Sequence, residues 1–277
     1  MRLTREEEAM LKGGHGEVVA EAMDYLVQFG EAFGAERLVD VVYCHHPAEM
    51  AIYRGEIDEI CELAERGARV VVPTTSSTLC YDLDQPEATG IPEDLAREQW
   101  RVVDPHKRMG IAATYTCTPY LLGYIPPRGA YIATVESSAI IYYNSVLGCR
   151  TNRGGTFTRY SAITGKYPYM GYLLDEHRRG THRVQVEVPP ERLRCPLDFS
   201  LLGFYVGGCV GSEVPVFDVR DLAGYGGSFA RQENLMALGA ALATSGSVTV
   251  YHIPGVTAEA RTTGEAFGGC APREATK

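Results

Sequence analysis

Residues 148–155 read GCRTNRGG and carry two guanidinium groups and an amide beside a pair of glycines. Arginine presents a planar fork of donors that fits a carboxylate or a phosphate, and glycine lets main-chain amides approach a ligand closely. We therefore expect Arg150, Asn152 and Arg153 to grip a small anionic substrate. The alternative interpretation is a solvated surface loop.

A second group of reactive side chains follows two expected strands. Cys117 lies in the segment TCTPY, and Glu136 and Ser137 open a helix after a strand expected at residues 131–135. The carboxyl ends of strands are where α/β sheets bind ligands. Glu136 and Ser137 also suit a purely structural role as a helix cap, because a carboxylate and a hydroxyl favour the positive N-terminus of a helix. The sequence alone leaves both interpretations open.

Several common catalytic and cofactor motifs are absent. The phosphate-binding-loop pattern fails at residues 160–161, and a dinucleotide fingerprint at residues 224–229 has Phe229 in place of its third glycine. Neither Gly-x-Ser-x-Gly nor His-Glu-x-x-His occurs. The metal-capable side chains at residues 44–46 and 175–182 lack the spacing that would close a tetrahedral site alone.

The overall composition narrows the functional class. The chain has 277 residues, a formal net charge of -9 and a pI near 5.3, which argues against nucleic-acid binding by phosphate neutralisation. The opening MRLTREEE lacks the apolar stretch of a secretory signal, and no apolar run reaches the roughly 20 residues of a membrane span. The eight cysteines form no Cys-x-x-Cys pair. We expect a cytoplasmic protein with reduced thiols and no membrane partner.

Alternating helices and strands are expected to position these groups. Thr4 and Glu7 form a capping box, and apolar residues at three- and four-residue spacing predict an amphipathic helix from Gly16 to Gly34. Further helices are expected at residues 57–66, 92–108 with a bend or interruption at Pro105, 137–147, 198–209 and 232–243. Strands are expected at residues 38–43, 70–72, near 111, 131–135, 214–219 and 248–253. This rhythm predicts an α/β fold with parallel or mixed sheets covered by helices on both faces.

Segments rich in glycine and proline predict where the chain divides into domains. Glycine and proline residues between positions 179 and 190 favour a boundary there. We expect a first α/β domain over residues 1–190 that bears the Cys117, Glu136 and Arg150 loops. A smaller α/β domain would follow over residues 191–277 and end in a frayed tail.

The same segments carry a resemblance to a known family. The opening LTREEEAMLKG, then VPTT from Val72 and TCTPY from Thr116, resemble the aconitase X family. The resemblance continues, in the same order along the chain, through ESSA at 136–139, NSVLG at 144–148, RTNR at 150–153, TGK at 164–166 and LDE at 174–176. Several separate motifs in one order are far more specific than any one of them.

The resemblance implies an iron-sulfur hydro-lyase built from aconitase-like three-layer subdomains. Family members dehydrate small hydroxy acids such as hydroxyproline and phosphomevalonate, and a smaller swivelling domain, fused or separate, completes their site. In this chemistry a 4Fe-4S cluster acts as Lewis acid on the leaving hydroxyl. By resemblance, Cys117 is a cluster ligand, and Glu136 and Ser137 contact substrate near the cluster. Ser77 is also expected to bind substrate, although residues 76–78 replace an Asn-Pro pair common in the family, because the serine keeps hydrogen-bonding capacity. No general base is assigned.

Three departures from the family pattern shape the functional hypothesis. Tyr115 stands where the family often has a cysteine, residues 44–50 replace a glycine-containing substrate loop, and a further region with two more cluster cysteines is not present in these 277 residues. One thiolate does not hold a cluster, which takes three or four protein ligands. We therefore expect a hetero-oligomer in which another chain supplies the remaining cysteines. The alternative is a non-catalytic binding or assembly subunit that has lost the cluster.

Overall fold

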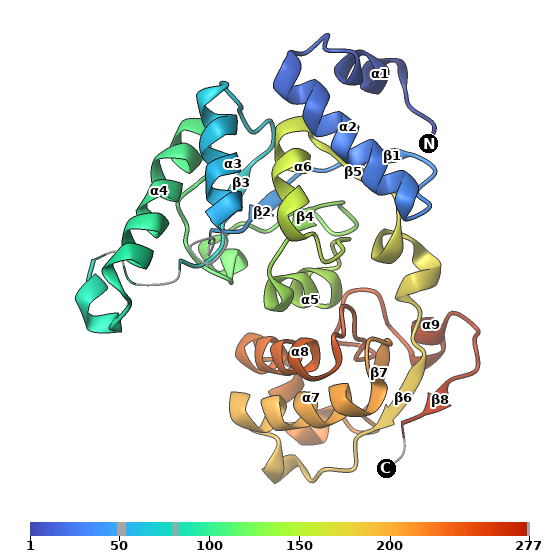
Figure 1. Cartoon of the computed structure of the whole chain (residues 1–277). Coiled ribbons are helices and arrows are strands. Elements are labelled where there is room, and N and C mark those ends of the chain that lie inside the picture. The colour runs from blue at the N-terminus through green and yellow to red at the C-terminus, as the bar shows by residue number, and fades with distance from the viewer. Residues whose placement is uncertain (49–53, 80–81, 83, 276–277) are drawn as a thin grey trace. The chain divides into compact units, whose positions relative to one another are not determined.

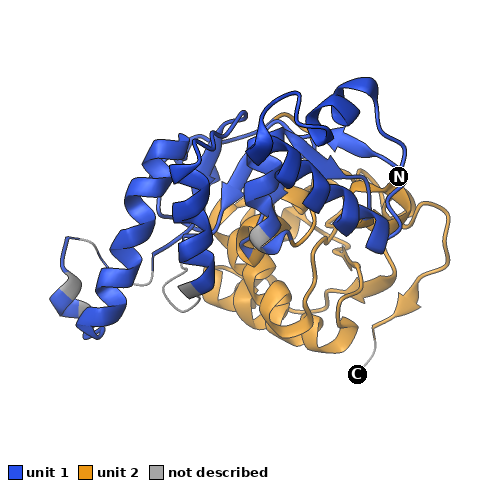
Figure 2. Ribbon diagram, turned by 45° about the horizontal axis from the view of Figure 1, so that its top comes forward, with its two compact units in different colours: residues 1–126, 131–136, 154–170 blue, residues 127–130, 137–153, 171–277 orange. Residues whose placement is uncertain are grey.

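The computed structural model describes residues 1–48, 54–79, 82 and 84–275, and the chain forms two compact units (Figure 2). The chain passes between the units at five points. Unit 1 comprises Met1–Pro126, Tyr131–Glu136 and Gly154–Met170, and unit 2 comprises Pro127–Ala130, Ser137–Arg153 and Gly171–Lys277. The expected domain boundary near residue 190 stays a prediction.

Helices and short strands alternate in both units (Figure 1). Unit 1 contains α1 (Arg5–Leu11), α2 (Glu17–Ala32), β1 (Leu38–Asp40), β2 (Cys44–His46), α3 (Arg54–Glu65), β3 (Thr74–Ser76), α4 (Glu93–Met109), β4 (Ala133–Thr134), α6 (Thr158–Thr164) and β5 (Lys166–Pro168). Unit 2 contains α5 (Ser137–Ser145), β6 (His182–Gln185), α7 (Pro196–Val210), β7 (Pro215–Asp218), α8 (Gln232–Gly246), α9 (Thr263–Phe267) and β8 (Arg273–Glu274). Single turns of 3-10 helix fill many of the connections. The predicted α/β class is confirmed.

Local capping and apolar spacing account for the helices. The Thr4 hydroxyl accepts a hydrogen bond from the Glu7 amide at 3.2 Å, and the Glu7 carboxylate accepts one from the Thr4 amide at 2.7 Å, so the predicted capping box is confirmed. The apolar face of α2 is buried at Ala22, Met23 and Leu26. The predicted helices that became α3, α5, α7 and α8 are confirmed as well, with ends shifted by a few residues.

The expected interruption at Pro105 is wrong, because α4 continues through this residue to Met109. A proline inside a helix leaves the carbonyl four residues earlier without its usual amide donor. Here that carbonyl belongs to Arg101, and the Cys61 thiol of α3 donates to it at 3.7 Å. The neighbouring helix thus supplies a weak substitute donor at the proline.

The strands of unit 1 differ most from the predictions. Of the strand expected at 38–43, only Leu38–Asp40 forms a strand, β1, which pairs antiparallel with β5. The next strand, β2, begins at Cys44 and lies in another sheet. The strand expected at residues 70–72 is wrong, because Val70 and Val71 donate to the helix carbonyls of Met109 and Ala162 instead of to a strand. The strand of this region is β3, formed by three polar residues four positions later.

A parallel three-stranded sheet with the order β3-β2-β4 forms the centre of unit 1. Cys44 of β2 pairs with Thr74 of β3 on one side and with Ala133 of β4 on the other. An isolated parallel bridge joins Thr75 to Ala112 and extends the sheet beyond β3. After β2, the chain adds β3 and then the Ala112 segment on one side of β2. It then crosses to the other side of β2 to form β4. The carboxyl end of β2 is therefore a topological switch point.

Unit 2 contains a second parallel sheet, with the order β7-β6-β8, and helices cover both faces of β7. Val216 packs against Ala266 and Phe267 of α9 on one face. Its neighbour Phe217 points to the opposite face, where it contacts Tyr251, whose hydroxyl donates to the Leu235 carbonyl of α8 at 3.2 Å. The strand expected at 248–253 is reduced to a bridge between Val216 and His252.

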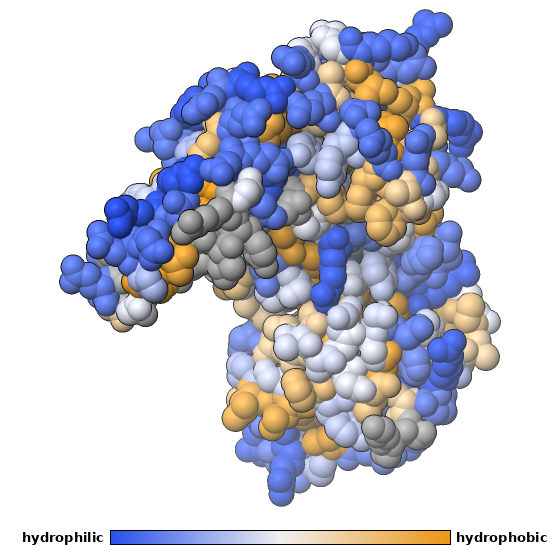
Figure 3. All heavy atoms as spheres, viewed as in Figure 1, coloured by the Kyte–Doolittle hydropathy of each residue, from blue (hydrophilic) through white to orange (hydrophobic). Residues whose placement is uncertain are grey.

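One helix face of unit 2 is apolar and exposed. Hydrophobic residues gather on the surface over α7 (Figure 3). They are Leu197, Leu201, Phe204 and Tyr205, each 57–66% exposed. Their spacing places them on one side of the helix. No helix within the described residues has both the length and the apolar character needed to cross a membrane.

Candidate active-site edge and arginine network

The carboxyl ends of the unit 1 strands bring three predicted residues to one edge of the sheet. Ser77 follows β3 directly, and Glu136 comes two residues after β4. Cys117 ends the segment that runs parallel to β3 from the bridge at Ala112. We call Ser77, Cys117 and Glu136 the sheet-edge group. Glu136 follows a strand as expected, whereas the strand expected before Cys117 is reduced to the bridge at Ala112, and Ser77 follows a strand that was not expected there. This edge of an α/β sheet is where ligands bind.

Hydrogen bonds hold the segment before Cys117 against β3. The Ser76 hydroxyl donates to the Ala112 carbonyl at 2.8 Å and accepts from the Thr114 amide at 3.1 Å. The Thr114 hydroxyl donates back to the Ser76 carbonyl at 2.8 Å, and the Thr116 amide donates to the same oxygen at 3.3 Å. These bonds place Cys117 immediately beyond the end of β3.

Tyr115 has a strained backbone directly before Cys117. Its φ is 42°, in the left-handed region that costs a non-glycine residue about 1–2 kcal/mol. Its buried hydroxyl has no hydrogen-bond partner in the described part of the chain, and burial raises its pKa. Strain of this kind persists where the surrounding structure requires it and is typical of functional sites. Here it turns the chain just before the half-buried Cys117 thiol.

Two buried polar groups at this edge lack partners among the described residues. The Ser77 amide donates to the His46 carbonyl at 2.7 Å, but the Ser77 hydroxyl, fully buried, makes no hydrogen bond. His45 contacts the Thr75 hydroxyl through Nδ1 at 2.8 Å, and its Nε2 makes none. Burial lowers the pKa of His45 to about 4, so its ring is neutral near pH 7. Buried groups without partners are uncommon, and a bound ligand is one way to satisfy them.

The side chains at this edge could supply one ligand to a metal cluster but not the complete set of ligands. Within residues 1–48, 54–79, 82 and 84–275, no group of three or more histidine, cysteine or acidic side chains lies close enough to hold a metal ion. Cys149 of unit 2 is buried, and burial raises the pKa of its thiol to about 12, so it stays protonated. The described residues therefore offer Cys117 as a single candidate ligand.

Unit 2 holds a second polar group, centred on a buried arginine. Arg178 is 3% exposed, and its guanidinium donates to the Glu259 carboxylate at 2.7 Å and to the Asn144 side chain at 2.9 Å. It also donates to the main-chain oxygens of Tyr172, Asn144 and Cys149 at 2.9–3.2 Å. All five of its N–H donors are thereby used. Burial lowers its pKa, and the Glu259 carboxylate opposes that shift.

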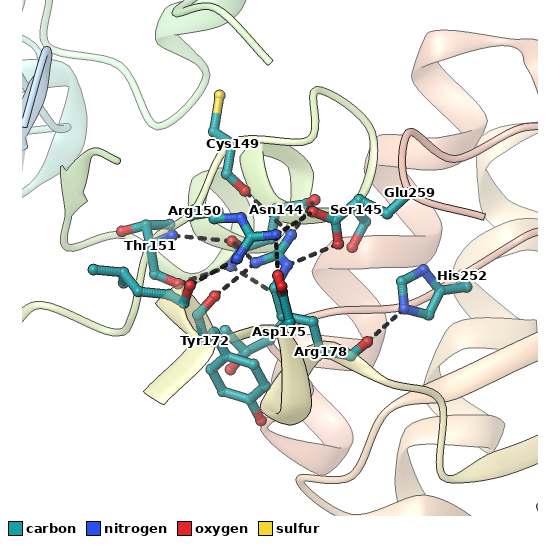
Figure 4. Close-up of polar contacts among 12 residues, drawn as sticks. Asn144, Ser145, Cys149, Arg150, Thr151, Tyr172, Asp175, Arg178, His252 and Glu259 are labelled. Carbon is teal, nitrogen blue, oxygen red and sulfur yellow. Dashed lines mark hydrogen bonds and ion pairs between the residues drawn. The ribbon is translucent and has the colours of Figure 1, made fainter. Parts of the chain in front are cut away.

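Asn144 lies at the centre of this group, which we call the arginine network (Figure 4). Its amide nitrogen donates to the Thr151 and Thr249 carbonyls at 3.0 and 3.2 Å, and its oxygen accepts from the Thr151 amide at 3.1 Å. Asn144 thereby joins α5 to the predicted anion loop and to the segment after α8. The motif around Asn144 is explained by this structural role.

The predicted anion-binding residues take part in the same network. Arg150 donates to the Leu173 carbonyl at 2.8 Å and pairs with Asp175 at 2.5 Å and Glu259 at 3.7 Å. The oxygen of the Asn152 side chain accepts from the Tyr172 amide at 2.7 Å. Arg153 is exposed and donates to the Ala243 carbonyl at 3.3 Å. Ser137, also predicted to bind substrate, is half-buried at the start of α5.

The sequence did not single out Arg178, Glu259 or His252 as parts of this unit. His252 donates through Nε2 to the Arg178 carbonyl at 2.7 Å across 74 positions of sequence. Contacts between residues so far apart in sequence leave no pattern of local residue spacing that could predict them. The signal available was weaker: an arginine beside the recognised LDE motif and a glutamate in an otherwise small-residue stretch.

Comparison with known proteins assigns the chain to a family. Sequence profiles described as the aconitase X first domain and the aconitase X second domain match residues 1–176 and 180–277. The chain belongs to the aconitase X family. The resemblance noted from the motifs is thereby confirmed over almost the whole chain.

Individual relatives agree with this assignment. The phosphomevalonate dehydratase large subunit of Methanothermobacter thermautotrophicus is 41% identical over 93% of this chain and 62% of its own length. The cis-3-hydroxy-L-proline dehydratase of Hypocrea jecorina is 33% identical over 97% of this chain and 44% of its own length. The crystal structure of Thermococcus kodakaraensis aconitase X in its holo-form superimposes with a TM-score of 0.83 at 34% identity, over 99% of this chain and 67% of that one.

The chain is shorter than these relatives. It spans 62–65% of the length of the large-subunit relatives from Methanothermobacter, Methanocaldococcus, Thermococcus and Methanosarcina. Their name, large subunit, implies that those proteins work with a small subunit.

Proposed function

We propose that this chain is a component of an aconitase X-type hydro-lyase that removes water from a small anionic hydroxy acid. The sheet-edge group carries the proposal, because Ser77 and Glu136 follow β3 and β4 on either side of β2, and Cys117 ends the segment that bridges to β3, at the edge where α/β sheets bind ligands. The relatives named as dehydratases of phosphomevalonate and of cis-3-hydroxy-L-proline support this reaction class.

The sheet-edge residues have separable roles in this proposal. Cys117 contributes one thiolate to an iron-sulfur cluster. The Ser77 hydroxyl, buried and without a partner in the described part of the chain, hydrogen-bonds the substrate, and Glu136 with Ser137 binds it from the start of α5. Arg150 and Asn152 shape the anion loop through their bonds to Leu173 and Tyr172, and Arg153 adds a positive charge.

The proposal includes a multi-chain assembly. A small swivelling-domain subunit and a chain that supplies the other cluster cysteines complete the site, because Cys117 alone does not hold a cluster. The exposed apolar face of α7 supports such an assembly, since contiguous apolar surface of this kind is typical of interfaces. A cytoplasmic location is proposed with it, in keeping with the seven cysteines of the described residues, which form no disulfide with one another.

The test is co-purification of the chain with its partners under anaerobic conditions, followed by measurement of iron, acid-labile sulfide and dehydration of candidate hydroxy acids. The assembly is expected to bind iron and sulfide in stoichiometric amounts, and Cys117→Ser is expected to lose both together with turnover. Cys270→Ser is the matched control, because Cys270 is an exposed thiol of unit 2. An assembly without iron and without dehydratase activity would overturn the proposal.

A second candidate function is a non-catalytic binding or assembly subunit. The observation that favours it is the single candidate thiol at the sheet edge in the described residues. It predicts a saturable calorimetric signal with intact hydroxy acids and no product from the same assembly. Measurable turnover that depends on Cys117 rejects it.

A further inference from the structure

Unit 2 contains a cavity of about 580 Å³, and Arg150 of the anion loop is the one residue it shares with the proposed function. Four arginines line it, and two of them, Arg150 and Arg178, belong to the arginine network and are neutralised by Asp175 and Glu259. The other two differ. The side chains of Arg128 and Arg179 form no hydrogen bond or ion pair with any described residue.

Glycines hold the stems of these two arginines in place. A Cβ on Gly148 would come within 3.1 Å of Cγ of Arg128, and a Cβ on Gly268 would come within 2.9 Å of Cδ of Arg179. Both glycines have positive φ, +69° and +55°, and both line the cavity. The aliphatic stems therefore lie directly against glycine backbone. Contact along the stem reduces the side-chain freedom that anion binding would otherwise have to remove.

His252 also lines the cavity, and one of its ring nitrogens is a buried acceptor. His252 is 3% exposed, and its Nε2 donates to the Arg178 carbonyl at 2.7 Å (Figure 4). The ring proton is therefore on Nε2, which leaves Nδ1 as an acceptor. This Nδ1 is buried and has no partner among the described residues. Burial lowers the pKa of His252, so the ring remains neutral and keeps its acceptor near pH 7.

We propose that this cavity binds a small oxyanion that also carries a hydroxyl group, with Arg128 and Arg179 on the anionic oxygens and His252 Nδ1 accepting from the hydroxyl. Monohydrogen phosphate and a hydroxy carboxylate share this chemistry. The remaining carboxylates of the lining, Asp175, Glu259 and Glu265, oppose an oxyanion that has no proton to donate. The site lies wholly within unit 2, and the three residues that would contact the anion, Arg128, Arg179 and His252, have no part in the proposed dehydratase function.

The test compares matched anions by titration calorimetry on the full chain, slightly above neutral pH and at constant ionic strength. Inorganic phosphate carries an O–H group under these conditions and sulfate, of the same shape and charge, does not. Phosphate is expected to bind at least about tenfold more tightly than sulfate, which is the scale of one hydrogen bond to a buried acceptor. Glycolate against acetate repeats the comparison for carboxylates, and the tighter of phosphate and glycolate identifies the preferred anion.

Variants locate the site. Arg128→Gln and Arg179→Gln are each expected to weaken phosphate or glycolate binding about tenfold. Arg220→Gln is the matched control, because Arg220 is an exposed arginine of unit 2 that does not line this cavity, and it is expected to change nothing. Equal affinity for phosphate and sulfate together with equal affinity for glycolate and acetate overturns the proposal. So does unchanged affinity in both arginine variants, or the absence of a saturable signal at millimolar anion.

Discussion

The sheet-edge group of unit 1 and the arginine network of unit 2 use similar polar side chains in opposite ways. All five N–H donors of Arg178 form hydrogen bonds to protein atoms. The two donors and two acceptor positions of the Asn144 side chain are occupied as well. The sheet edge instead keeps Ser77 with an unused buried hydroxyl and Tyr115 with a strained backbone. Completed hydrogen bonding is typical of a structural role, and unpaired buried groups at a strand end are consistent with a ligand site.

This difference revises the meaning of the recognised motifs. The loop with Arg150 and Asn152 carries the residue types of an anion site, yet Arg150 binds a protein carbonyl and a carboxylate, and the Asn152 side chain accepts from the Tyr172 amide. Among the four arginines that line the unit 2 cavity, the two without described partners are Arg128 and Arg179, which lie outside any recognised motif. A motif identifies the side chains that could bind a ligand. The hydrogen bonds in the structure show whether those side chains contact other protein groups instead.

The largest expected effect comes from breaking the arginine network. Arg178→Ala is expected to lower the free energy of unfolding of unit 2 by about 3–5 kcal/mol, because it leaves the Glu259 carboxylate and several carbonyls without their donor. The chain's single tryptophan, Trp100, lies in α4, so its fluorescence follows unit 1 while far-UV circular dichroism follows both units. Urea titrations should show the loss mainly by dichroism. Arg192→Ala, at an exposed position, is the control, and a loss in Arg178→Ala below about 1 kcal/mol would contradict a structural role.

A smaller effect is expected from the buried histidines of unit 1. Burial lowers the pKa of His106 to about 3, and neither ring nitrogen has a partner among the described residues. The unfolded chain takes up this proton below about pH 6.5 and the folded chain does not, so stability falls as pH decreases from about 6.5 toward 3. Between about pH 8 and 5 this one group accounts for a loss of about 2 kcal/mol.

His106→Leu should remove that part of the acid sensitivity. The variant is expected to lose about 2 kcal/mol less than the parent chain over the same pH range, as measured by urea unfolding followed through Trp100. His15→Leu, an exposed histidine of the same unit, should leave the pH profile nearly unchanged. Identical profiles for His106→Leu and the parent would show that His106 is already protonated in the fold.

A substitution at the end of α8 tests how backbone conformation contributes to the stability of unit 2, separately from the arginine network. Ser247 follows α8 with φ of 61° and is exposed, so Ser247→Gly should stabilise the chain by about 1 kcal/mol. Thr244→Gly, at an exposed position inside the same helix, should destabilise it by about the same amount. Thermal unfolding followed by dichroism distinguishes the two. Equal effects of the two glycines would contradict the left-handed cap.

The smallest effect on stability is expected at the sheet edge itself. Ser77→Ala should change the free energy of unfolding by less than about 0.5 kcal/mol, because its hydroxyl makes no bond in the described part of the chain, yet dehydration by the assembled enzyme should fall at least about tenfold. Ser76→Ala is the matched neighbour and should cost about 1–2 kcal/mol, since its hydroxyl bonds Ala112 and Thr114. A larger stability loss at Ser77 than at Ser76 would reverse their assigned roles.

The helices could be predicted from the sequence because their signals are local. The capping box at Thr4 and the apolar spacing of α2 act within a few residues of one another. The strands are two to four residues long, and β3 consists of Thr74, Thr75 and Ser76, which resemble a polar loop until β2 pairs with them. Parallel pairing partners lie far away in sequence, so residue pattern alone located these strands poorly.

The same contrast holds for the two functional regions. Cys117 and Glu136 could be singled out because strand ends and family motifs are visible in a linear sequence. The arginine network could not, because Arg178 meets Asn144 across 34 positions, Glu259 across 81 and His252 across 74. Burial of an arginine depends on carboxylate and carbonyl partners that only the folded chain assembles.

The repeated passage of the chain between its two units has a consequence for synthesis on the ribosome. Every residue of α5 from Ala139 to Ser145 is buried, and α5 packs against α8, which begins at Gln232. At about 5–20 residues per second, α5 waits several seconds for that partner after it emerges. A nascent chain therefore exposes an apolar helix in the middle of its sequence. This interval is the point at which a chaperone, or a slower stretch of translation, would most affect the yield of folded protein.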